Sequence, residues 1–285
     1  MAVNLREVKF AYNTPKKKQA FKFTLEDINL HIDSKDEFIT IVGESGSGKS
    51  TLVQLLNGLL IATFGDVVVF DKKLSGKKLK LKDTRKRVGL IFQFPEHQLF
   101  DDTVLKDVCF GPKNFGMKNY LDLAKDALSV VGIDESLYEN SPFNLSGGQQ
   151  RRVAIAGVLA SNPDILVFDE PTVGLDPQGK KELVTLLKKL NEEYHKTIIL
   201  ITHDMDLLGE VSKRVVVLKQ GKICFDGTKD ELFSNSELVR KTSLDYPNTI
   251  KILKEIKTKF NVELNEYKYT ILDVYSELKK VFGDE

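Results

Sequence analysis

A glycine-rich segment at residues 43–51, Gly-Glu-Ser-Gly-Ser-Gly-Lys-Ser-Thr, constrains the fold of this chain more than any other segment. It follows the short apolar run 38–42 and precedes residues 50–60, where apolar side chains recur at helical spacing. A strand, a glycine-rich turn and a helix in this order direct backbone N–H groups and the helix N-terminus toward one point. The order therefore predicts a loop that binds phosphate groups.

The residue types in this segment match the pattern G-x-x-x-x-G-K-S of nucleotide-binding phosphate loops. The glycines let backbone N–H groups face the phosphates, Lys49 would neutralise the β- and γ-phosphates, and Ser50 would bind Mg²⁺. The alternative is a glycine-rich turn with an exposed lysine, although a chain of this length shows the pattern by accident only about once in a hundred cases. We predict an ATP site formed by Gly43, Glu44, Ser45, Gly46, Ser47, Gly48, Lys49, Ser50 and Thr51.

Two acidic residues follow a second apolar run, at residues 165–168. The run predicts a buried strand, and Asp169 and Glu170 would then emerge at the carboxyl edge of the sheet, beside the phosphate loop. Asp169 is expected to hold Mg²⁺, and Glu170 to orient the attacking water or accept its proton. By itself this pattern is weak, because many strands end at acidic, solvated turns.

Further apolar runs indicate an α/β fold. The expected strands include residues 3–12 and 21–32, separated by a turn near Pro15 and Lys16, and residues 88–92, 197–202 and 215–218. Helical spacing covers residues 179–194, a short stretch after His203, and most of residues 105–160, with expected breaks at 111–112, 132 and 141–142. This alternation predicts a mostly parallel sheet covered on both faces.

Charge and cysteine content exclude several classes. The chain has 42 lysines and arginines against 41 aspartates and glutamates, so no overall field favours nucleic acid or an anionic membrane. Basic stretches at residues 16–18 and 72–82 are expected to be solvated surface. Cys109 and Cys224 lack disulfide or metal spacing. Residues 1–10 do not resemble a signal peptide, and no apolar run approaches the ~18 residues that cross a bilayer, so the chain is expected to be soluble by itself.

A second glycine turn points to a family. Leu145, Ser146, Gly147, Gly148 and Gln149 precede a helical stretch, and a glycine turn at a helix N-terminus is again a potential anion site. This pentapeptide resembles the signature of ATP-binding cassette ATPases. The resemblance implies that the signature reaches the γ-phosphate of a nucleotide held by the opposite subunit. Two ATP molecules would then be sandwiched between two cassettes, and the protein would work as a dimer.

Four further positions match the same family in order and spacing. The resemblance assigns Tyr12 to stacking on adenine, and Gln93 to the loop glutamine that senses the γ-phosphate, Mg²⁺ and the membrane partner. It assigns Asp176 to the loop between subunits, and His203 to the switch histidine that contacts the γ-phosphate. The plainer alternatives are, respectively, a core aromatic, a solvated loop residue, a helix cap and a satisfied histidine at a strand end. The presence of all four in order disfavours these alternatives together.

Residues 92–104, Phe-Gln-Phe-Pro-Glu-His-Gln-Leu-Phe-Asp-Asp-Thr-Val, closely resemble the glutamine loop of the ATPase subunits of energy-coupling factor transporters. The Phe-Pro-Glu version is more similar to the second of the two paralogous ATPases. The resemblance implies a paralogous ATPase in a heterodimer, or a second copy in a homodimer, with a transmembrane coupling subunit, a substrate-capturing membrane subunit and no nucleic acid. One detail departs, because the family often has histidine and threonine at the positions of Glu44 and Ser45.

The resemblance also implies the domain organisation. The expected fold class is α/β, an ABC-type phosphate-loop NTPase with a mostly parallel core sheet, an N-terminal antiparallel β subdomain, an inserted helical subdomain and a small C-terminal helical or mixed appendage. The expected ATP-binding domain spans residues 1–240, with its nucleotide-binding core at 1–92 and 161–240 and the helical signature subdomain at 93–160. Residues 241–285, with apolar side chains at amphipathic spacing, are expected to form a dimerisation domain.

The intact Glu170, His203 and signature predict an enzyme that hydrolyses ATP with Mg²⁺. The expected function is to power uptake of vitamins or other micronutrients by an energy-coupling factor importer, from the cytoplasmic face of the cell membrane. Alternatives are the ATPase of a cobalt or nickel importer or of another ABC transporter, a non-hydrolysing regulatory subunit, and a soluble ATPase that acts on nucleic acid or the ribosome. The last class usually has two cassettes or a long coiled-coil insertion, and this sequence has neither.

Overall fold

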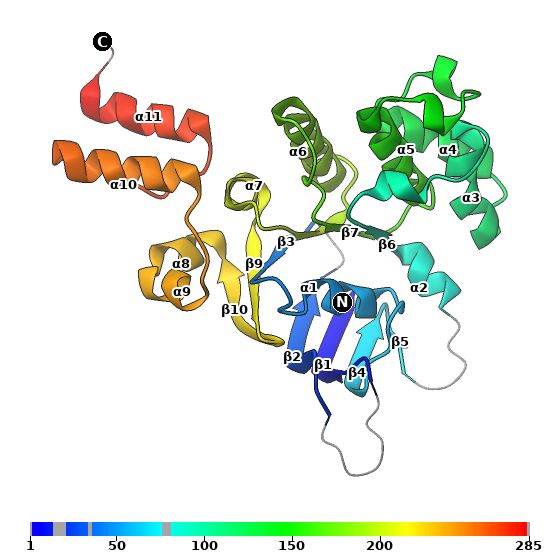
Figure 1. The fold of residues 1–285 in the computed structure, drawn as a ribbon, viewed down its shortest axis with the longest axis horizontal. Helices are drawn as coiled ribbons and strands as arrows, with labels where there is room; N and C mark the ends of the chain where they lie inside the picture. Colours follow the sequence, from blue (N-terminus) through cyan, green and yellow to red (C-terminus); the bar gives the residue numbers. More distant parts are fainter. Residues whose placement is uncertain (1, 14–20, 34–35, 76–80, 284–285) are drawn as a thin grey trace.

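The computed structural model describes residues 2–13, 21–33, 36–75 and 81–283, which form two sheets and the helices around them (Figure 1). The first sheet is antiparallel and confirms the expected N-terminal β subdomain. In it β1 (Val3–Phe10) lies between β2 (Leu25–Ile32) and β4 (Phe64–Val69), and β5 (Lys72–Lys73) pairs with β4. The expected turn near Pro15 and Lys16 lies outside the described residues, as does the basic stretch 16–18.

The second sheet has the order β10-β9-β3-β8-β7-β6 and is mostly parallel, as predicted. Its parallel strands are β3 (Phe38–Val42), β6 (Val88–Ile91), β7 (Ile165–Asp169), β8 (Thr197–Ile201) and β9 (Arg214–Lys219). The edge strand β10 (Lys222–Thr228) is antiparallel to β9. Ile201 is in register with both Ile41 and Asp169, so the ends of β3, β7 and β8 lie at the same edge of the sheet.

Helices and the antiparallel sheet cover the two faces of the core sheet. On one face, Ile39 and Ile41 pack in a core with α1 (Lys49–Leu56) and the antiparallel sheet. On the other face, Phe168 and Leu200 pack with the remaining core helices. These are α3 (Val104–Phe115), α4 (Tyr120–Val130), α5 (Gly147–Leu159), α6 (Pro177–Glu192) and α7 (Met205–Val211). The central parallel strands are mostly apolar, as expected for strands with both faces buried.

The helical region 104–159 departs from expectation in the position of its first break, which lies between α3 and α4 at residues 116–119. We predicted a break at residues 111–112, but α3 continues through Pro112 and ends at Gly116, where φ is +76°. Gly111 serves a packing role, because a Cβ there would lie 3.0 Å from Ser161 Oγ and 3.2 Å from the carbonyl oxygen of Gly157. The glycine therefore allows α3 to approach α5 closely. The other expected breaks are confirmed, and the short 3-10 helices η2 (Glu135–Leu137) and η3 (Pro142–Asn144) follow the turn at Gly132.

The remaining helices lie at the periphery. A short helix, α2 (Lys82–Arg87), precedes β6, while α8 (Lys229–Ser234) and α9 (Ser236–Lys241) pack on the β9 side of the core. The last two, α10 (Asn248–Phe260) and α11 (Ile271–Phe282), lie at the opposite end of the molecule from α3–α5 (Figure 1). Within the described ranges, no helix has the length and apolar character needed to cross a bilayer. The domain boundaries stay a prediction.

Candidate nucleotide-binding site

A cavity of about 420 Å³ opens at the carboxyl edge of β7 and β8. It brings together residues that are far apart in the sequence and that come from the phosphate loop, the end of β7 and the segment after β8. Its lining consists of Tyr12, Thr24, Ser45, Gly46, Gly48, Lys49, Ser50, Thr51, Gln93, Asp169, Glu170, Ile201 and His203. Most of the predicted ATP and Mg²⁺ residues therefore share one cavity. Thr24 and Ile201 were not predicted, because no motif marks either position.

Glycines at two positions of the loop are required by the close approach of other segments. Gly43 has φ +146°, and a Cβ there would lie 2.0 Å from the carbonyl oxygen of Leu218 on β9. Gly48 has φ +104°, and a Cβ there would lie 2.7 Å from Leu25 Cδ2 on β2. The loop is thus wedged between the two sheets with its backbone against the cavity. This arrangement fits a phosphate group, since successive backbone N–H groups bind anions.

Lys49 lies under the loop and is buried. Its Nζ donates hydrogen bonds to the carbonyl oxygens of Gly43, at 2.7 Å, and Glu44, at 3.0 Å. Burial lowers the pKa of Lys49, and the charges of Glu170 and Asp169 oppose that shift. Its hydrogen-bond partners are neutral carbonyls in a partly desolvated site, so an anion in the cavity would gain a strong charge-assisted contact.

Asp169 and Ser50 fit a magnesium ion that arrives with a nucleotide. Burial raises the pKa of Asp169, while a hydrogen bond from Ser50 and the charge of Lys49 lower it. Gln93 lines the same cavity. Mg²⁺ is usually held by one or two protein oxygens together with phosphates and waters, and these side chains supply such oxygens. Among the described residues, no three His, Cys, Asp or Glu side chains gather as a metal cage.

Glu170 is held in an unusual conformation beside His203. Its φ is +51°, in the left-handed region, which is costly for a glutamate. Oε1 is buried and accepts no hydrogen bond from the described residues, although Nε2 of His203 lies 3.1 Å away. Burial raises the pKa of Glu170 to about 7, and it lowers the pKa of His203. A buried carboxylate with a free oxygen and a pKa near neutrality is suited to accept a proton from water.

Tyr12 stands at the rim of the cavity with its ring exposed. Its hydroxyl lies 2.9 Å from Thr51 Oγ1, and its ring meets Phe10 edge to face with centroids 4.9 Å apart. Both contacts fix the ring while leaving much of its surface open. The exposed ring excludes the alternative of a core aromatic, and its stacking on adenine stays a prediction.

The signature residues do not line this cavity. Ser146, Gly147 and Gly148 instead border a separate cavity of about 600 Å³, together with Asp176. Ser146 and Gln149 form a reciprocal capping box at the start of α5, and Asp176 accepts a hydrogen bond from the backbone N–H of Gly179 at 2.7 Å. Asp176 is therefore a helix cap in this chain, and its role between subunits is a prediction.

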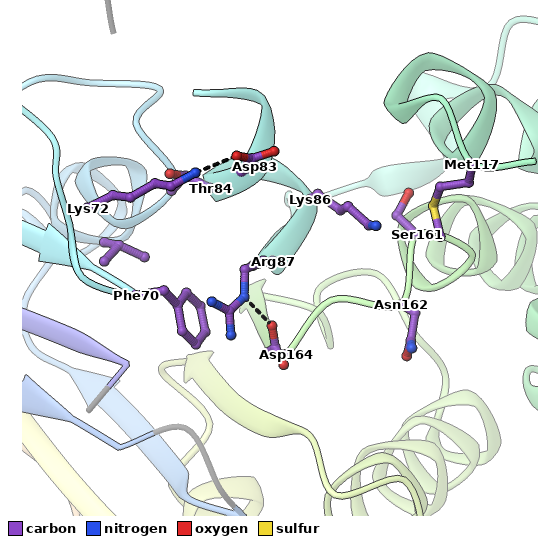
Figure 2. A pocket seen from close by; sticks show the side chains of 11 residues that line it. Phe70, Lys72, Asp83, Thr84, Lys86, Arg87, Met117, Ser161, Asn162 and Asp164 are labelled. Carbon is purple, nitrogen blue, oxygen red and sulfur yellow. Dashed lines mark hydrogen bonds and ion pairs between the residues drawn. The ribbon is translucent and has the colours of Figure 1, made fainter. Parts of the chain in front are cut away.

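A third cavity, of about 520 Å³, lies at the opposite edge of the core sheet (Figure 2). Arg87 precedes β6 and Asp164 precedes β7, so this cavity adjoins the amino ends of these strands. Arg87 Nε donates to Asp164 Oδ2 at 2.7 Å, its guanidinium stacks over Phe70, and Lys72 pairs with Asp83. Two of its cations already have carboxylate partners, and none of the described residues that line it is a glycine, so the described lining does not fit a nucleotide.

Comparison with known proteins decides the family. The family model described as ABC transporter matches residues 25–173. The chain belongs to the ABC transporter family. This confirms the predicted fold class and the predicted activity, an ATPase coupled to transport.

Relatives place this ABC transporter chain among the energy-coupling factor ATPases, as predicted. The energy-coupling factor transporter ATP-binding protein EcfA2 of Bacillus thuringiensis (strain Al Hakam) is 42% identical over 279 residues, covering 96% of this chain and 94% of that protein. EcfA2 of Clostridium tetani (strain Massachusetts / E88) is 40% identical over 291 residues, covering 100% and 99%. The chain is an ATPase subunit of the energy-coupling factor type of ABC importer, as these relatives and the shared fold indicate.

Solved structures of ABC ATPases share the fold. The structure of cbiO1 from Clostridium perfringens, part of the ABC transporter complex cbiONQ, superposes with a TM-score of 0.74 and is 34% identical, covering 92% of this chain and 99% of that chain. A dimeric ATP-binding cassette in a post-hydrolysis state, bound to ADP and Pi, has a TM-score of 0.68 and 32% identity, covering 79% and 98%. Most of this chain thus follows the cassette fold.

Proposed function

We propose that this ATPase powers the uptake of vitamins or other micronutrients from the cytoplasmic face of the cell membrane, as one half of an ATP-sandwich dimer. One observation carries the catalytic part of the proposal. The free carboxylate oxygen of Glu170 lies in the same cavity as Lys49 and Asp169, at the mouth of the phosphate loop. A base, a phosphate-binding cation and a metal-binding carboxylate are the groups that phosphoryl transfer to water needs.

We assign the following roles. When bound, ATP supplies the reactive γ-phosphoryl group, and Mg²⁺ supplies positive charge next to its oxygens. Lys49 and the loop N–H groups would bind the phosphates, while Ser50, Gln93 and Asp169 would hold the metal. Glu170 would orient water and take its proton, and His203, which follows β8 and lines the same cavity, would contact the γ-phosphate. Tyr12 stacks on the base.

The dimer is supported by the position of the signature. Ser146 and Asp176 face a cavity of their own rather than this chain's phosphate loop, as they would if each served the nucleotide of a partner. A similar cassette was solved as a dimer with ADP and Pi. The partner would be the paralogous ATPase or a second copy of this chain.

The C-terminal helices supply a second surface for that dimer. On α11, Ile271 is 83% exposed and Leu272 76% exposed, and both are large apolar side chains. Phe260 and Phe282 meet edge to face and hold α10 against α11. Exposed apolar side chains gathered on one helix commonly mark an interaction surface, which supports dimerisation through residues 241–285.

The membrane partners would contact the segment after Gln93. Here Phe100 and Phe110 form an edge-to-face pair, and both rings are more than half exposed. This exposed aromatic pair follows Gln93, which lines the nucleotide cavity. The pair is therefore suited to transmit a movement at the nucleotide to a partner protein. We assign this surface to the transmembrane coupling subunit, with the substrate-capturing subunit joined through it.

Purification from membranes tests the proposal. The full chain, carrying an affinity tag, is expressed in the cell it comes from, and the solubilised membranes are passed over the affinity matrix. We expect the paralogous ATPase, the coupling subunit and substrate-capturing subunits to be recovered with it, and the complex to hydrolyse ATP only with Mg²⁺. Recovery with ribosomes or nucleic acid instead, without membrane proteins, would contradict the proposal.

A further inference from the structure

One buried guanidinium joins three segments that the motifs define separately. Arg151 lies in the first turns of α5, two residues after the last signature residue, and is only 6% exposed. Its Nε donates to Glu96 Oε2 at 3.2 Å. Its two terminal nitrogens donate to the carbonyl oxygen of Val173, at 3.2 and 3.1 Å. A planar fork of donors that meets two acceptors fixes their relative positions more tightly than a single contact does.

Each of the two acceptors is close to a residue of the nucleotide sites. Glu96 lies in η1 (Pro95–Gln98), three residues after Gln93, which lines the phosphate-loop cavity. Val173 lies between Glu170 and Asp176, and its N–H donates to the carbonyl oxygen of Glu170 at 3.3 Å. Arg151 therefore holds the helix that begins at the signature against both the glutamine loop and the segment that follows the catalytic glutamate.

The packing around Arg151 supports a single rigid unit. Phe94 has φ +55°, in the left-handed region, and its ring packs beside Gly174. A Cβ built on Gly174 would lie 3.5 Å from Cε1 of Phe94. The cavity next to the signature is lined by all three segments. Since the guanidinium is buried and Glu96 is its only carboxylate contact among the described residues, separating them would leave two poorly solvated charges. The segments are thus expected to move together.

We propose that Arg151 is a positioning residue that links this chain's own nucleotide site to the signature and Asp176 segment, which act on the opposite nucleotide. The proposal rests on the dimer proposed above. A displacement of the loop at Gln93 is carried through Glu96 and Arg151 to the start of α5, where Ser146 lies. Occupancy of one site would in this way set the position of the groups that complete the other, which is positive coupling between the two ATP sites.

The test uses three variants of the full chain in its dimer: Arg151→Met, Glu96→Gln and both together. Arg87→Met is the matched control, because Arg87 also bonds a carboxylate from another segment but does so at the far edge of the sheet. Four quantities are measured for each, namely affinity of the single chain for a fluorescent ATP analogue, kcat, the Hill coefficient for ATP, and Tm.

We expect Arg151→Met to keep the affinity for the ATP analogue within about twofold, to lower kcat roughly tenfold or more and to bring the Hill coefficient close to one. Glu96→Gln should change kcat and the Hill coefficient in the same direction, and adding it to Arg151→Met should have little further effect, because both disrupt one link. The control should keep the wild-type Hill coefficient even if its Tm falls.

Three results would overturn the inference. They are an unchanged Hill coefficient in both single variants, fully additive losses of kcat in the double variant, and a loss that parallels unfolding or weaker binding of the analogue. If Arg151→Met does not fold, Glu96→Gln is measured alone, because this substitution preserves the size of the side chain. A wild-type chain that forms no ATP-dependent dimer, either with a second copy or with the paralogous ATPase, would instead refute the proposed function.

Discussion

Nε2 of His203 lies 3.1 Å from Oε1 of Glu170, an oxygen that accepts no hydrogen bond from the described residues. The pKa of the histidine is lowered and that of the glutamate is raised, each mainly by burial. At neutral pH the imidazole is therefore uncharged, and the pair is not a fixed ion pair. The two groups remain free to act on different atoms of a bound nucleotide and its water.

The rate of hydrolysis should depend on the protonation of Glu170. Because the pKa of Glu170 is about 7, it is protonated below that pH and cannot act as a base. We expect kcat/KM for ATP to rise with pH up to about 7 and then to level off. Initial rates from about pH 5.5 to about pH 8.5, with ATP binding measured in parallel, check this. A rate that is constant or falls across the acid half of this range would count against Glu170 as the base.

Glu170→Gln should abolish turnover and preserve ATP binding. The amide cannot accept the proton, so we expect kcat to fall by about 10² to 10⁴, the usual contribution of a general base. The substitution keeps the shape of the side chain, so ATP should still bind and hold the dimer closed. Steady-state hydrolysis and size-exclusion chromatography with ATP measure both effects. Undiminished hydrolysis by the reconstituted transporter would falsify the role of Glu170.

The same substitution should stabilise the fold above neutral pH. The folded-state pKa of Glu170, about 7, exceeds its unfolded-state value, so the native chain keeps a proton that the unfolded chain releases. Stability therefore falls as pH rises between the two values, and the full loss, on the order of 3 kcal/mol, is present above pH 7. Glu170→Gln removes this loss. We expect a higher Tm than wild type near pH 8 and little difference near pH 5, by differential scanning calorimetry.

Gly43→Ala should disrupt the phosphate loop, whereas Gly116→Ala should have a smaller effect. Both glycines have positive φ, so each alanine costs about 1–2 kcal/mol in backbone strain. Only at Gly43 does a Cβ also collide with backbone, 2.0 Å from the carbonyl oxygen of Leu218, while nothing lies within 4 Å at Gly116. We expect Gly43→Ala to lose ATP affinity and Gly116→Ala to retain it, in equilibrium titrations. Equal affinities would show that the loop tolerates the displacement.

The exposed side of η1 should matter for uptake more than for nucleotide binding. His97 and Gln98 are exposed and bond to none of the residues that line the nucleotide cavity in the described chain. Replacing both with alanine should lower uptake by the reconstituted transporter several-fold, because a surface that couples to a partner loses contacts, while ATP affinity stays within about twofold. If the variant co-purifies with the membrane subunits and transports normally, the coupling surface lies elsewhere.

Local pattern was enough to predict the part of the fold that carries the chemistry. The strand before the phosphate loop has the predicted bounds, Phe38–Val42. Asp169 and Glu170 lie at the same edge of the sheet as the phosphate loop, as the apolar run before them indicated. A phosphate-binding glycine loop needs a strand before it and a helix after it, so its sequence indicates the elements that flank it. The strands β4 and β10 were not predicted, because few of their side chains are buried and their pairing partners are set by the tertiary fold.

Contacts between motifs could not be predicted. Arg151 and Glu96 are 55 positions apart, and each belongs to a segment with its own apparent role. The break expected at residues 111–112 was wrong for a related reason. A glycine and a proline usually end a helix, but Gly111 is used for close packing against α5, which only the three-dimensional arrangement reveals.

Helix α1 joins the phosphate loop to the core shared by both sheets, since Leu52 and Val53 pack there without any exposure. Nucleotide that binds the loop therefore stabilises the fold as a whole by mass action, and the stabilisation rises with the logarithm of its concentration. The ATP level of a cell becomes a determinant of how long each molecule survives proteases. A cell with a low ATP concentration is expected to lose this subunit by faster degradation, so its capacity for import falls together with its ATP concentration.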